Sequence, residues 1–385
     1  MVFVSLVVMS NRYRILVQLD PTISGELRSR SLDVLLKDLS KLKEDLEVKK
    51  VEAVDGFLEV FSDNLVEACM CISKFPGVFT ASICRRVRNR TKEIVKAVTE
   101  MGKKVLRKNM TFNIVISGNE RRRADLYYVI MDKVLDEVDA KPDDYRPDKL
   151  LFVFLGKRYA YVEFEGFIGP SGIPIGVMGR SLILFDGSLK SYVAALKSSR
   201  SGFTPYLLFL IPAKSPPNYL RRGFFKAWTL VKCLPMRRIT MYTLSVEDEA
   251  LNKYGFHSLL IKLASKIAKR IKAKVIVFGI NYVRNLESIL KVCSIPIKEG
   301  ILTFLPNLGM GSHEILSSIT DWEDRYKLDW VEWNVSDYYP SFIREVKEEE
   351  IEALLGEVIK VEVDRGPVGW HKALDRYLSL RNKGS

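Results

Sequence analysis

The sequence predicts an α/β protein with more than one domain, and three observations support this. In the second half of the chain, apolar runs of strand length alternate with helical stretches, as in a doubly wound parallel sheet. In the first part, shorter elements follow in the order β-α-β-β-α, which is typical of a ferredoxin-like α+β domain. A chain of 385 residues, 47% of them apolar, is long enough for two or three folded cores.

The net charge of the chain indicates what kind of partner it binds. The net charge is +13, with 28% charged residues and no long block of one sign. A basic excess spread over a folded chain favours nucleic acid over a membrane surface, the alternative being a generally charge-rich protein. Five scattered cysteines and three isolated histidines form no zinc or nucleophile pattern, so no metal site is predicted and a reducing, cytoplasmic setting is expected. No membrane-spanning segment is found, because residues 1–9 are apolar but too short; they extend a strand, or Met9 is the true start.

The first predicted domain covers residues 11–74. Tyr13–Gln18 alternates as a strand, and residues 31–45 have apolar side chains at helical spacing. A hairpin over residues 48–61 turns at Asp55-Gly56, and a second helix covers residues 64–73. Phe75-Pro76-Gly77-Val78 then interrupts the pattern as a linker.

The second predicted domain, residues 75–168, carries much of the basic excess. We expect a basic helix over residues 84–107, a strand over 111–117, a basic loop over 118–123, a helix over 124–138 and a hairpin over 150–164. Two arginine-rich clusters in one small domain favour contacts with an RNA backbone, and a solvated charged face is the alternative. The predicted RNA-binding residues are Arg85, Arg86, Arg88 and Arg90 on the helix and Arg121, Arg122 and Arg123 in the loop.

The third predicted domain, residues 169–344, contains the βα repeats. Strands are expected over residues 182–185, 207–211, 238–243 and 274–278, and helices over 192–198, 215–234, 258–272, 285–292 and 314–318. The loop Asp186-Gly187-Ser188-Leu189-Lys190-Ser191 lies between the first strand and its helix. Such a loop directs backbone N–H groups and a helix N-terminus at one point, which suits a phosphate; an ordinary βα turn is the alternative.

Three stretches together resemble the tRNA 4-thiouridine synthetase (tRNA sulfurtransferase) family, which is also linked to thiamine thiazole synthesis. They are Phe75-Pro76-Gly77-Val78, the connector Gly169-Pro-Ser-Gly-Ile-Pro-Ile-Gly176, and Ser191-Tyr-Val-Ala-Ala-Leu196. The resemblance covers about residues 11–340. It implies an N-terminal ferredoxin-like domain (11–74), a tRNA-binding THUMP domain (75–168) and a PP-loop ATP-pyrophosphatase domain (169–344), followed by an extension of unknown role (345–385).

The chain departs from the family's ATP motif, Ser-Gly-Gly-x-Asp-Ser. Gly187 and Ser191 are kept, Asp186 replaces the first serine, and Lys190 replaces the acidic residue at the magnesium-phosphate end. A hard cation would therefore lose an oxygen ligand, although Lys190 contacting phosphate directly is an alternative. The resemblance implies ATP with Mg²⁺ as cofactor, with Gly187, Ser188, Lys190 and Ser191 as its binding residues.

Sulfur handling is altered as well. The family's cysteine falls here in Ser336-Asp337-Tyr338-Tyr339-Pro340, and no cysteine follows Cys293. The helix start Gly-Met-Asp of the family reads Gly309-Met310-Gly311 here. No catalytic residue can be assigned.

These departures favour a tRNA-binding paralogue that acts in tRNA modification as a binding or scaffold subunit. An active tRNA-adenylating sulfurtransferase with an external sulfur donor is the alternative, and a small-molecule nucleotide-binding enzyme is a third reading. Expected partners are tRNA, a sulfur-donor or modification enzyme, and a second copy of the chain, but no membrane. Trp322, Trp330 and Trp333 either pack in a core or interface or stack on a base.

Overall fold

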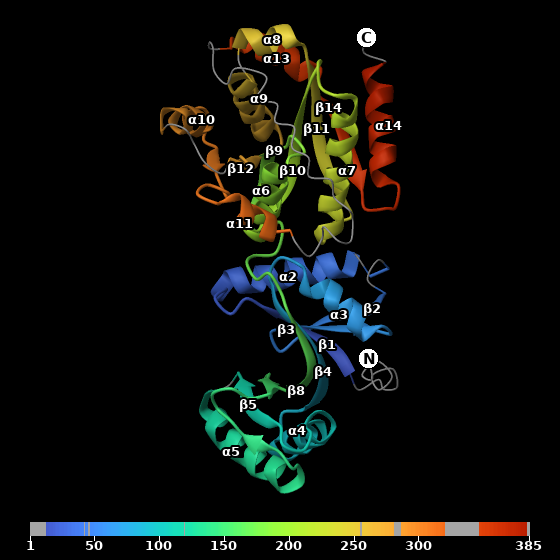
Figure 1. Cartoon of the computed structure of the whole chain (residues 1–385), viewed down its shortest axis with the longest axis vertical. Helices are drawn as coiled ribbons and strands as arrows, with labels where there is room; N and C mark the ends of the chain where they lie inside the picture. The colour runs from blue at the N-terminus through green and yellow to red at the C-terminus, as the bar shows by residue number, and fades with distance from the viewer. Residues whose placement is uncertain are drawn as a thin grey trace. The chain divides into compact units, whose positions relative to one another are not determined.

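The computed structural model describes residues 13–41, 43–44, 47–118, 120–254, 256–280, 286–319 and 346–382. The chain divides into two compact units, Met1–Gly172 and Ile173–Ser385, which we call the N-terminal and C-terminal units. Both are mixed α/β structures, and the C-terminal unit contains the predicted parallel sheet (Figure 1). The fold class expected from the sequence is therefore confirmed.

A single eight-stranded sheet runs through the N-terminal unit in the order β2-β3-β1-β4-β8-β7-β5-β6. Strands β1 and β4, which the sequence assigns to different domains, pair antiparallel along their length. The boundary expected at residue 74 stays a prediction, as does the one at residue 344. The strands are β1 (Tyr13–Leu19), β2 (Val48–Val54), β3 (Phe57–Ser62), β4 (Val78–Arg88), β5 (Thr111–Ser117), β6 (Lys141–Pro142), β7 (Lys149–Leu155) and β8 (Tyr159–Ile168).

Two helix pairs cover separate parts of this sheet. One apolar cluster joins β1 and β4 to α2 and α3, and Leu35 and Leu39 of α2 are buried in it. The other joins β5, β7 and β8 to α4 and α5, and Ile94 and Val98 are buried there. Each helix thus turns the apolar stripe seen in the sequence towards the sheet. The helices are α2 (Gly25–Lys41), α3 (Leu65–Ser73), α4 (Thr91–Val105) and α5 (Glu120–Glu137).

The prediction of one helix over residues 84–107 is wrong. Strand β4 continues to Arg88, Arg90 is the N-cap of α4, and the helix begins only at Thr91. Tertiary pairing decides this, because β4 is hydrogen-bonded to β1 on one side and to β8 on the other. The expected basic loop is also wrong, since α5 begins at Glu120 and its first turn contains the three arginines Arg121, Arg122 and Arg123.

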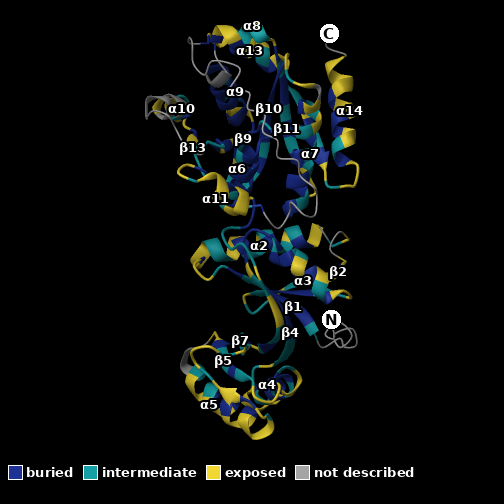
Figure 2. Cartoon of the chain, in the orientation of Figure 1, coloured by how far each residue is buried: buried dark blue, intermediate teal, exposed yellow. Residues whose placement is uncertain are grey.

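The C-terminal unit is built on a six-stranded sheet in the order β13-β12-β9-β10-β11-β14. Its pairs are parallel except β11 with β14. Figure 2 shows buried residues along these strands, between helices whose outer faces are exposed. The strands are β9 (Gly179–Leu184), β10 (Phe203–Pro212), β11 (Arg238–Val246), β12 (Ala273–Val277), β13 (Leu302–Phe304) and β14 (Ile359–Asp364). The helices are α6 (Leu189–Arg200), α7 (Pro217–Cys233), α8 (Asp248–Tyr254), α9 (Phe256–Arg270), α10 (Leu286–Lys298), α11 (Ser312–Ser317), α13 (Glu348–Gly356) and α14 (Gly369–Arg381).

The C-terminal segment has a structural role in this unit. Strand β14 pairs along β11, and Val361, Val363 and Tyr377 are buried in the same apolar cluster as β9 and β10. Residues 346–382 therefore complete the sheet and its core. Trp322, Trp330, Trp333 and residues 336–340, on which the sulfur-site comparison depends, lie outside the described residues.

Candidate functional site

The polar loop follows β9, the strand from which the chain adds strands first on one side of the sheet and then on the other. From the central strand β9 the chain proceeds to β10 and β11 on one side, and later to β12 and β13 on the other. The carboxyl ends of β9 and β12 are therefore neighbours, and such switch points are where doubly wound sheets bind ligands. The loop that follows β9 is placed there.

The loop is shorter than the sequence predicts. Ser188 is the N-cap of α6, and its hydroxyl oxygen accepts the backbone N–H of Ser191 at 3.3 Å. The helix thus begins at Leu189, and Lys190 and Ser191 belong to its first turn rather than to the loop. Gly187 has φ +75°, a conformation that side chains other than glycine rarely adopt, so glycine is needed at this turn.

Asp186 is bonded to its own loop. Its Oδ1 accepts the backbone N–H of Ser188 at 2.8 Å and the hydroxyl of Ser191 at 2.6 Å. These donors lie at the N-terminus of α6, where an oxyanion is favoured. The carboxylate of Asp186 is therefore the oxyanion that accepts from these two donors in this structure.

A buried amide fixes the first turn of α6. Asn307 is fully buried, and its Nδ2 donates to the carbonyl oxygen of Lys190 at 2.7 Å. Gly279, directly after β12, lies so close that a Cβ there would be 2.7 Å from the backbone nitrogen of Ser191. The loop is thus packed tightly on the side of β12.

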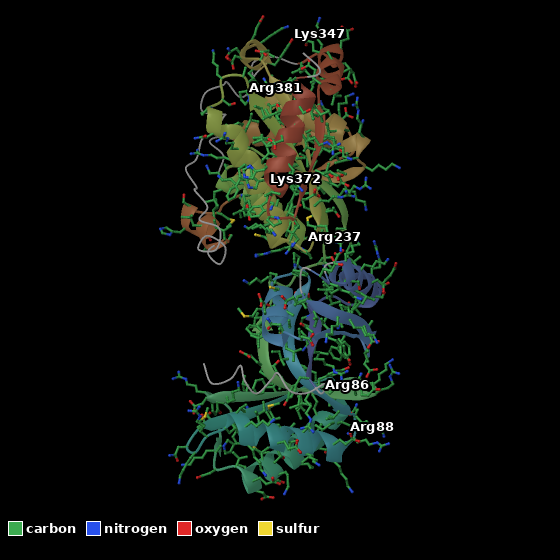
Figure 3. The ribbon with its side chains drawn as sticks, turned by 90° about the vertical axis from the view of Figure 1, so that its right-hand side faces the viewer. Arg86, Arg88, Arg237, Lys347, Lys372 and Arg381 are labelled. Atoms are coloured by element: carbon green, nitrogen blue, oxygen red, sulfur yellow. The ribbon has the colours of Figure 1, made fainter. Side chains whose placement is uncertain are left out.

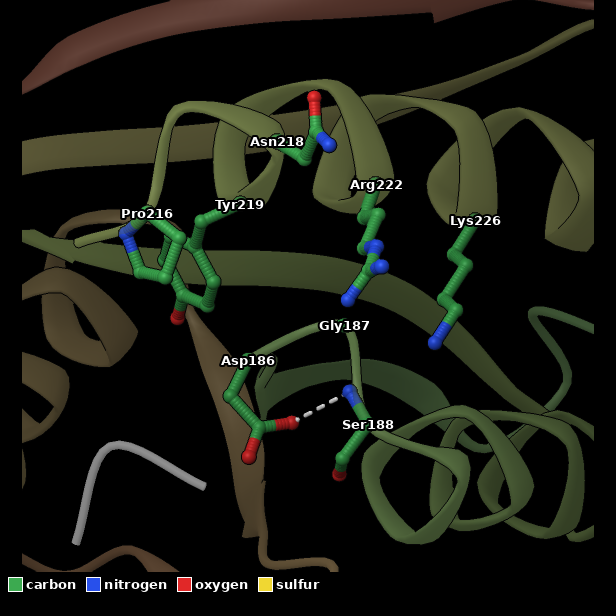
Figure 4. A pocket seen from close by; sticks show the side chains of 8 residues that line it. All are labelled: Asp186, Gly187, Ser188, Pro216, Asn218, Tyr219, Arg222 and Lys226. Atoms are coloured by element: carbon green, nitrogen blue, oxygen red, sulfur yellow. Dashed lines mark hydrogen bonds between the residues drawn. The ribbon is translucent and has the colours of Figure 1, made fainter. Parts of the chain in front are cut away.

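On the other side, a hollow of about 120 Å³, partly open to solvent, separates the loop from α7 (Figure 4). Arg222 and Lys226 lie one helical turn apart and point from α7 towards Gly187 and Ser188. Burial, with a smaller effect of the Asp186 charge, raises the pKa of Tyr219 well above its usual value. The full lining is Asp186, Gly187, Ser188, Pro216, Asn218, Tyr219, Arg222 and Lys226.

The predicted nucleotide-binding residues are only partly brought together. Gly187 and Ser188 line the hollow, whereas Lys190 and Ser191 do not, and Ser191 is 2% exposed. Donors that would hold ATP phosphates are bonded to Asp186, and Lys190 supplies no oxygen ligand for Mg²⁺. The loop as built does not fit a magnesium-bound triphosphate.

Sequence reasoning missed Arg222 and Lys226. The helix expected over residues 215–234 is present as α7, and both prolines are accommodated at its start, Pro216 as the N-cap and Pro217 as the first helical residue. The available signal was a pair of cations at positions i and i+4 on the helix that follows strand β10, the neighbour of β9.

The N-terminal unit carries a second, basic hollow on its sheet. It is lined by Arg14, Arg85, Arg86, Val87, Arg88, Glu93 and Tyr159. Beneath it, the fully buried Glu59 accepts hydrogen bonds from Arg14 at 2.7 Å and from Tyr161 at 2.6 Å, and Arg86 lies at 3.2 Å. The Arg86 guanidinium also lies 4.2 Å from the centre of the Tyr159 ring. A buried carboxylate therefore holds two of the arginines in place.

The predicted RNA-binding arginines fall into two groups. Arg85 is paired with Glu100, Arg122 donates to Asn89 and Thr91, and Arg123 donates to the carbonyl oxygen of Gly118. Arg88 and Arg90 are exposed, and within the described residues neither side chain has an acidic partner. Figure 3 shows Arg86 and Arg88 on the same strand, two residues apart and hence on one face of the sheet. The side chain of Arg121 is not described.

Among the described residues, no group of three or more His, Cys, Asp or Glu side chains is arranged to hold a metal ion. Nor does any described helix combine the length and the apolarity needed to cross a membrane.

Comparisons with known proteins give a consistent picture. No protein-family model matches the chain. It is 25% identical over 323 residues to a probable tRNA sulfurtransferase of Thermoanaerobacter sp. (strain X514), covering 76% of this chain and 81% of that protein. The corresponding protein of Mycoplasmopsis pulmonis is 21% identical over 309 residues, covering 75% and 79%. That of Malacoplasma penetrans is 26% identical over 194 residues, about half of each chain.

Solved structures agree on the fold. A 4-thiouridine synthetase in complex with RNA and bound ATP matches 95% of this chain and 98% of its own, with a TM-score of 0.69 and 15% identity. The PH1313 protein of Pyrococcus horikoshii Ot3 matches 80% and 99%, with a TM-score of 0.61 and 16% identity. The chain is thus similar in sequence to tRNA sulfurtransferases and in fold to a 4-thiouridine synthetase, in line with the resemblance expected from the sequence.

Proposed function

We propose that this protein binds tRNA and acts in tRNA modification as a binding or scaffold subunit, with an ATP site that has been altered. The observation that carries the scaffold role is the pair of hydrogen bonds from Ser188 and Ser191 to Asp186. Adenylation requires ATP phosphates held in line and their charge neutralised. In this loop two donors are already bonded to the Asp186 carboxylate, which adds negative charge where the charge of the phosphates would have to be neutralised.

Support for tRNA as the ligand comes from the relatives and from charge. The relatives named above are tRNA sulfurtransferases, and the similar solved structure is a complex with RNA. The exposed Arg88 and Arg90 lie where β4 passes into α4. Arginines that have no acidic partner among the described residues, beside a basic hollow, are suited to phosphate contacts, whereas Arg122 and Arg123 donate to the protein itself.

The first test measures tRNA affinity of the Arg88→Glu/Arg90→Glu variant at several salt concentrations. We expect affinity to fall by tenfold or more and the slope of log K against log salt to decrease by about 1–2, because each phosphate contact contributes about 0.7–0.9. The charge-matched control is Lys37→Glu/Lys372→Glu, two exposed lysines on α2 and α14. Equal affinity of both double variants would refute the assignment of this face to RNA.

Replacing Arg121, Arg122 and Arg123 together is a poorer test than the sequence suggests. Arg122 connects α5 to Asn89 and Thr91, so its loss also disturbs the junction between β4 and α4. Reduced binding in that triple variant would therefore mix a structural effect with the loss of a contact.

The second test follows release of AMP and pyrophosphate from ATP in the presence of tRNA and Mg²⁺. The scaffold role predicts no turnover above a protein-free control. Release that depends on tRNA would instead establish the alternative function, an adenylating enzyme that receives sulfur from an external donor. Tight, salt-sensitive tRNA binding without turnover would support the proposal.

A further inference from the structure

One asparagine lies between the two exposed arginines that the proposed function assigns to RNA. Arg88 is the last residue of β4 (Figure 3), Arg90 is the N-cap of α4, and the half-buried Asn89 joins them. The backbone bends at Asn89, because the strand ends and the helix begins there. The conformation of this one residue therefore decides where both arginine side chains start.

Both ends of the Asn89 side-chain amide are bonded within the protein. Its Nδ2 donates to the carbonyl oxygen of Gly156 at 2.7 Å, and its Oδ1 accepts from Arg122 Nη1 at 2.9 Å. The backbone N–H of Asn89 donates to the carbonyl oxygen of Arg158 at 3.0 Å. Because the donor and the acceptor have separate partners, the amide is held in one orientation. Asn89 thus joins the β4–α4 junction to the β7–β8 turn and to the first turn of α5.

The two segments that this asparagine joins are themselves fixed. In the β7–β8 turn, Asp55 accepts the backbone N–H groups of Arg158 and Tyr159 at 2.8 and 3.1 Å. Before α5, Gly118 lies so close to β7 that a Cβ there would be 2.4 Å from the carbonyl oxygen of Leu155. The asparagine amide is therefore bonded to parts of the N-terminal unit that have their own anchors.

The two arginines have no comparable support from their own side-chain contacts. Within the described residues neither has an acidic partner, and only the backbone N–H of Arg88 is bonded to an acid, at 3.2 Å from Glu93. Arg90 provides no side-chain cap to α4. Short polar residues are preferred at an N-cap, and a cation there opposes the helix dipole. An arginine at this position suits an anionic ligand better than it suits the helix.

We infer that Asn89 is a positioning residue for RNA binding, which presents Arg88 and Arg90 in one arrangement before RNA is bound. The inference rests on the proposed function and adds how its two arginines are held. Groups that are already ordered bind more tightly, because less conformational freedom is lost on association. Arg122 then acts by bonding to Asn89 rather than by contacting a phosphate.

The test measures the affinity of full-length Asn89→Ala for unfractionated tRNA at several salt concentrations. We expect affinity to fall by about three- to tenfold at each concentration, because the two arginines must then be ordered on binding. The slope of log K against log salt should keep its wild-type value, whereas each lost phosphate contact would lower it by about 0.7–0.9. Arg122→Gln should give the same result although it removes a cation.

Asn64→Ala is the matched control. Asn64 also lies between a strand and a helix, where it caps α3 by accepting the Glu67 N–H at 3.4 Å, and its Nδ2 donates to the Glu67 carboxylate at 2.8 Å. Both alanine variants should lower the melting temperature, because each removes two side-chain hydrogen bonds. Only Asn89→Ala should weaken tRNA binding.

A double-mutant comparison separates positioning from a general structural effect. In an Arg88→Gln/Arg90→Gln background, Asn89→Ala should change tRNA affinity by less than about twofold, because no arginine remains to be positioned. A defect in the fold would weaken binding equally in both backgrounds.

Two results would overturn the inference: wild-type tRNA affinity of Asn89→Ala, or a loss that is equally large with and without the two arginines. If Arg88→Gln/Arg90→Gln loses affinity while Asn89→Ala does not, the proposed function stands and the positioning role fails. If Arg88→Gln/Arg90→Gln binds tRNA like the wild type, the proposed RNA contact fails and the positioning role fails with it.

Discussion

Restoring the family's loop chemistry tests whether Asp186 closes the ATP site. The double variant Asp186→Ser/Lys190→Asp returns the serine and the acidic residue that the family motif has at these positions. It frees the Ser188 N–H, which lies 2.8 Å from Asp186 Oδ1, and the Ser191 hydroxyl, which lies 2.6 Å from it. Both donors then become available to a phosphate oxygen.

The expected gain follows from the geometry. A phosphate oxygen that accepted from the Ser188 N–H would lie within about 4 Å of the present carboxylate. Two unit charges at about 4 Å repel by about 4 kcal/mol at an effective dielectric constant of about 20. Because the hollow is partly open to solvent, we reduce this repulsion by about half, to about 2 kcal/mol. Removing it with Asp186→Ser alone should therefore improve ATP affinity about 30-fold.

The assay is equilibrium ATP binding with and without Mg²⁺. Lys190→Asp alone should give no gain, because Asp186 still holds the loop donors, while the double variant should add a dependence on Mg²⁺. The reasoning is refuted if Asp186→Ser binds ATP no more tightly than the wild type.

Three further predictions concern stability. Burial raises the pKa of Asp38 from 3.8 to about 6, so the folded state binds this proton more tightly than the unfolded chain does. The resulting contribution to stability is complete below about pH 4 and is lost as the pH rises through about 6. Asp38→Asn should therefore raise the free energy of unfolding by about 2 kcal/mol at pH 7.5 and leave it nearly unchanged below pH ~4, as measured by urea denaturation. Glu59→Leu leaves the Arg14 side chain, 9% exposed, without its carboxylate and should cost about 3–5 kcal/mol; a loss under about 1 kcal/mol would show that Arg14 finds other compensation. Gly223→Ala places a Cβ against the Phe209 ring of β10 and should lower the free energy of unfolding by about 1–3 kcal/mol, seen as a lower melting temperature. Gly356→Ala, which faces open space, is the control.

The alternation of strands and helices in the C-terminal half could be predicted from the sequence, because a parallel strand that is buried on both faces is a continuous apolar run. Residues 182–185 and 207–211 form continuous apolar runs, and both fall in β9 and β10 or directly after them. Strand β14 was not predicted, although Ile359–Asp364 alternates apolar and charged residues as a half-buried strand does. What the sequence does not indicate locally is its partner, because β14 pairs antiparallel with β11, which lies more than 100 residues earlier in the chain.

The misreading of residues 84–107 has a physical cause as well. The segment contains two adjacent arginines, Arg85 and Arg86, and then Arg88 after one apolar residue. Its apolar residues therefore follow neither the helical period of 3.6 nor the strand period of 2. What makes the segment a strand is its two partners: Arg85 lies opposite Tyr13 of β1 and Val162 of β8. Tertiary context outweighed local preference, and three of the predicted RNA-binding arginines therefore lie on a sheet instead of a helix face.

The loop shows why matching a motif does not identify a nucleotide site. Gly187 and Ser191 match the family's ATP motif, yet each has a structural reason to be present in this chain. Gly187 adopts φ +75° at the turn, and Ser191 donates its hydroxyl to Asp186. Both residues are therefore accounted for without ATP. The residue that would distinguish an ATP-binding loop from this one is Asp186, which stands where the family motif has serine. An affinity measurement that varies Asp186 while keeping Gly187 and Ser191 separates the structural role of the motif from its binding role.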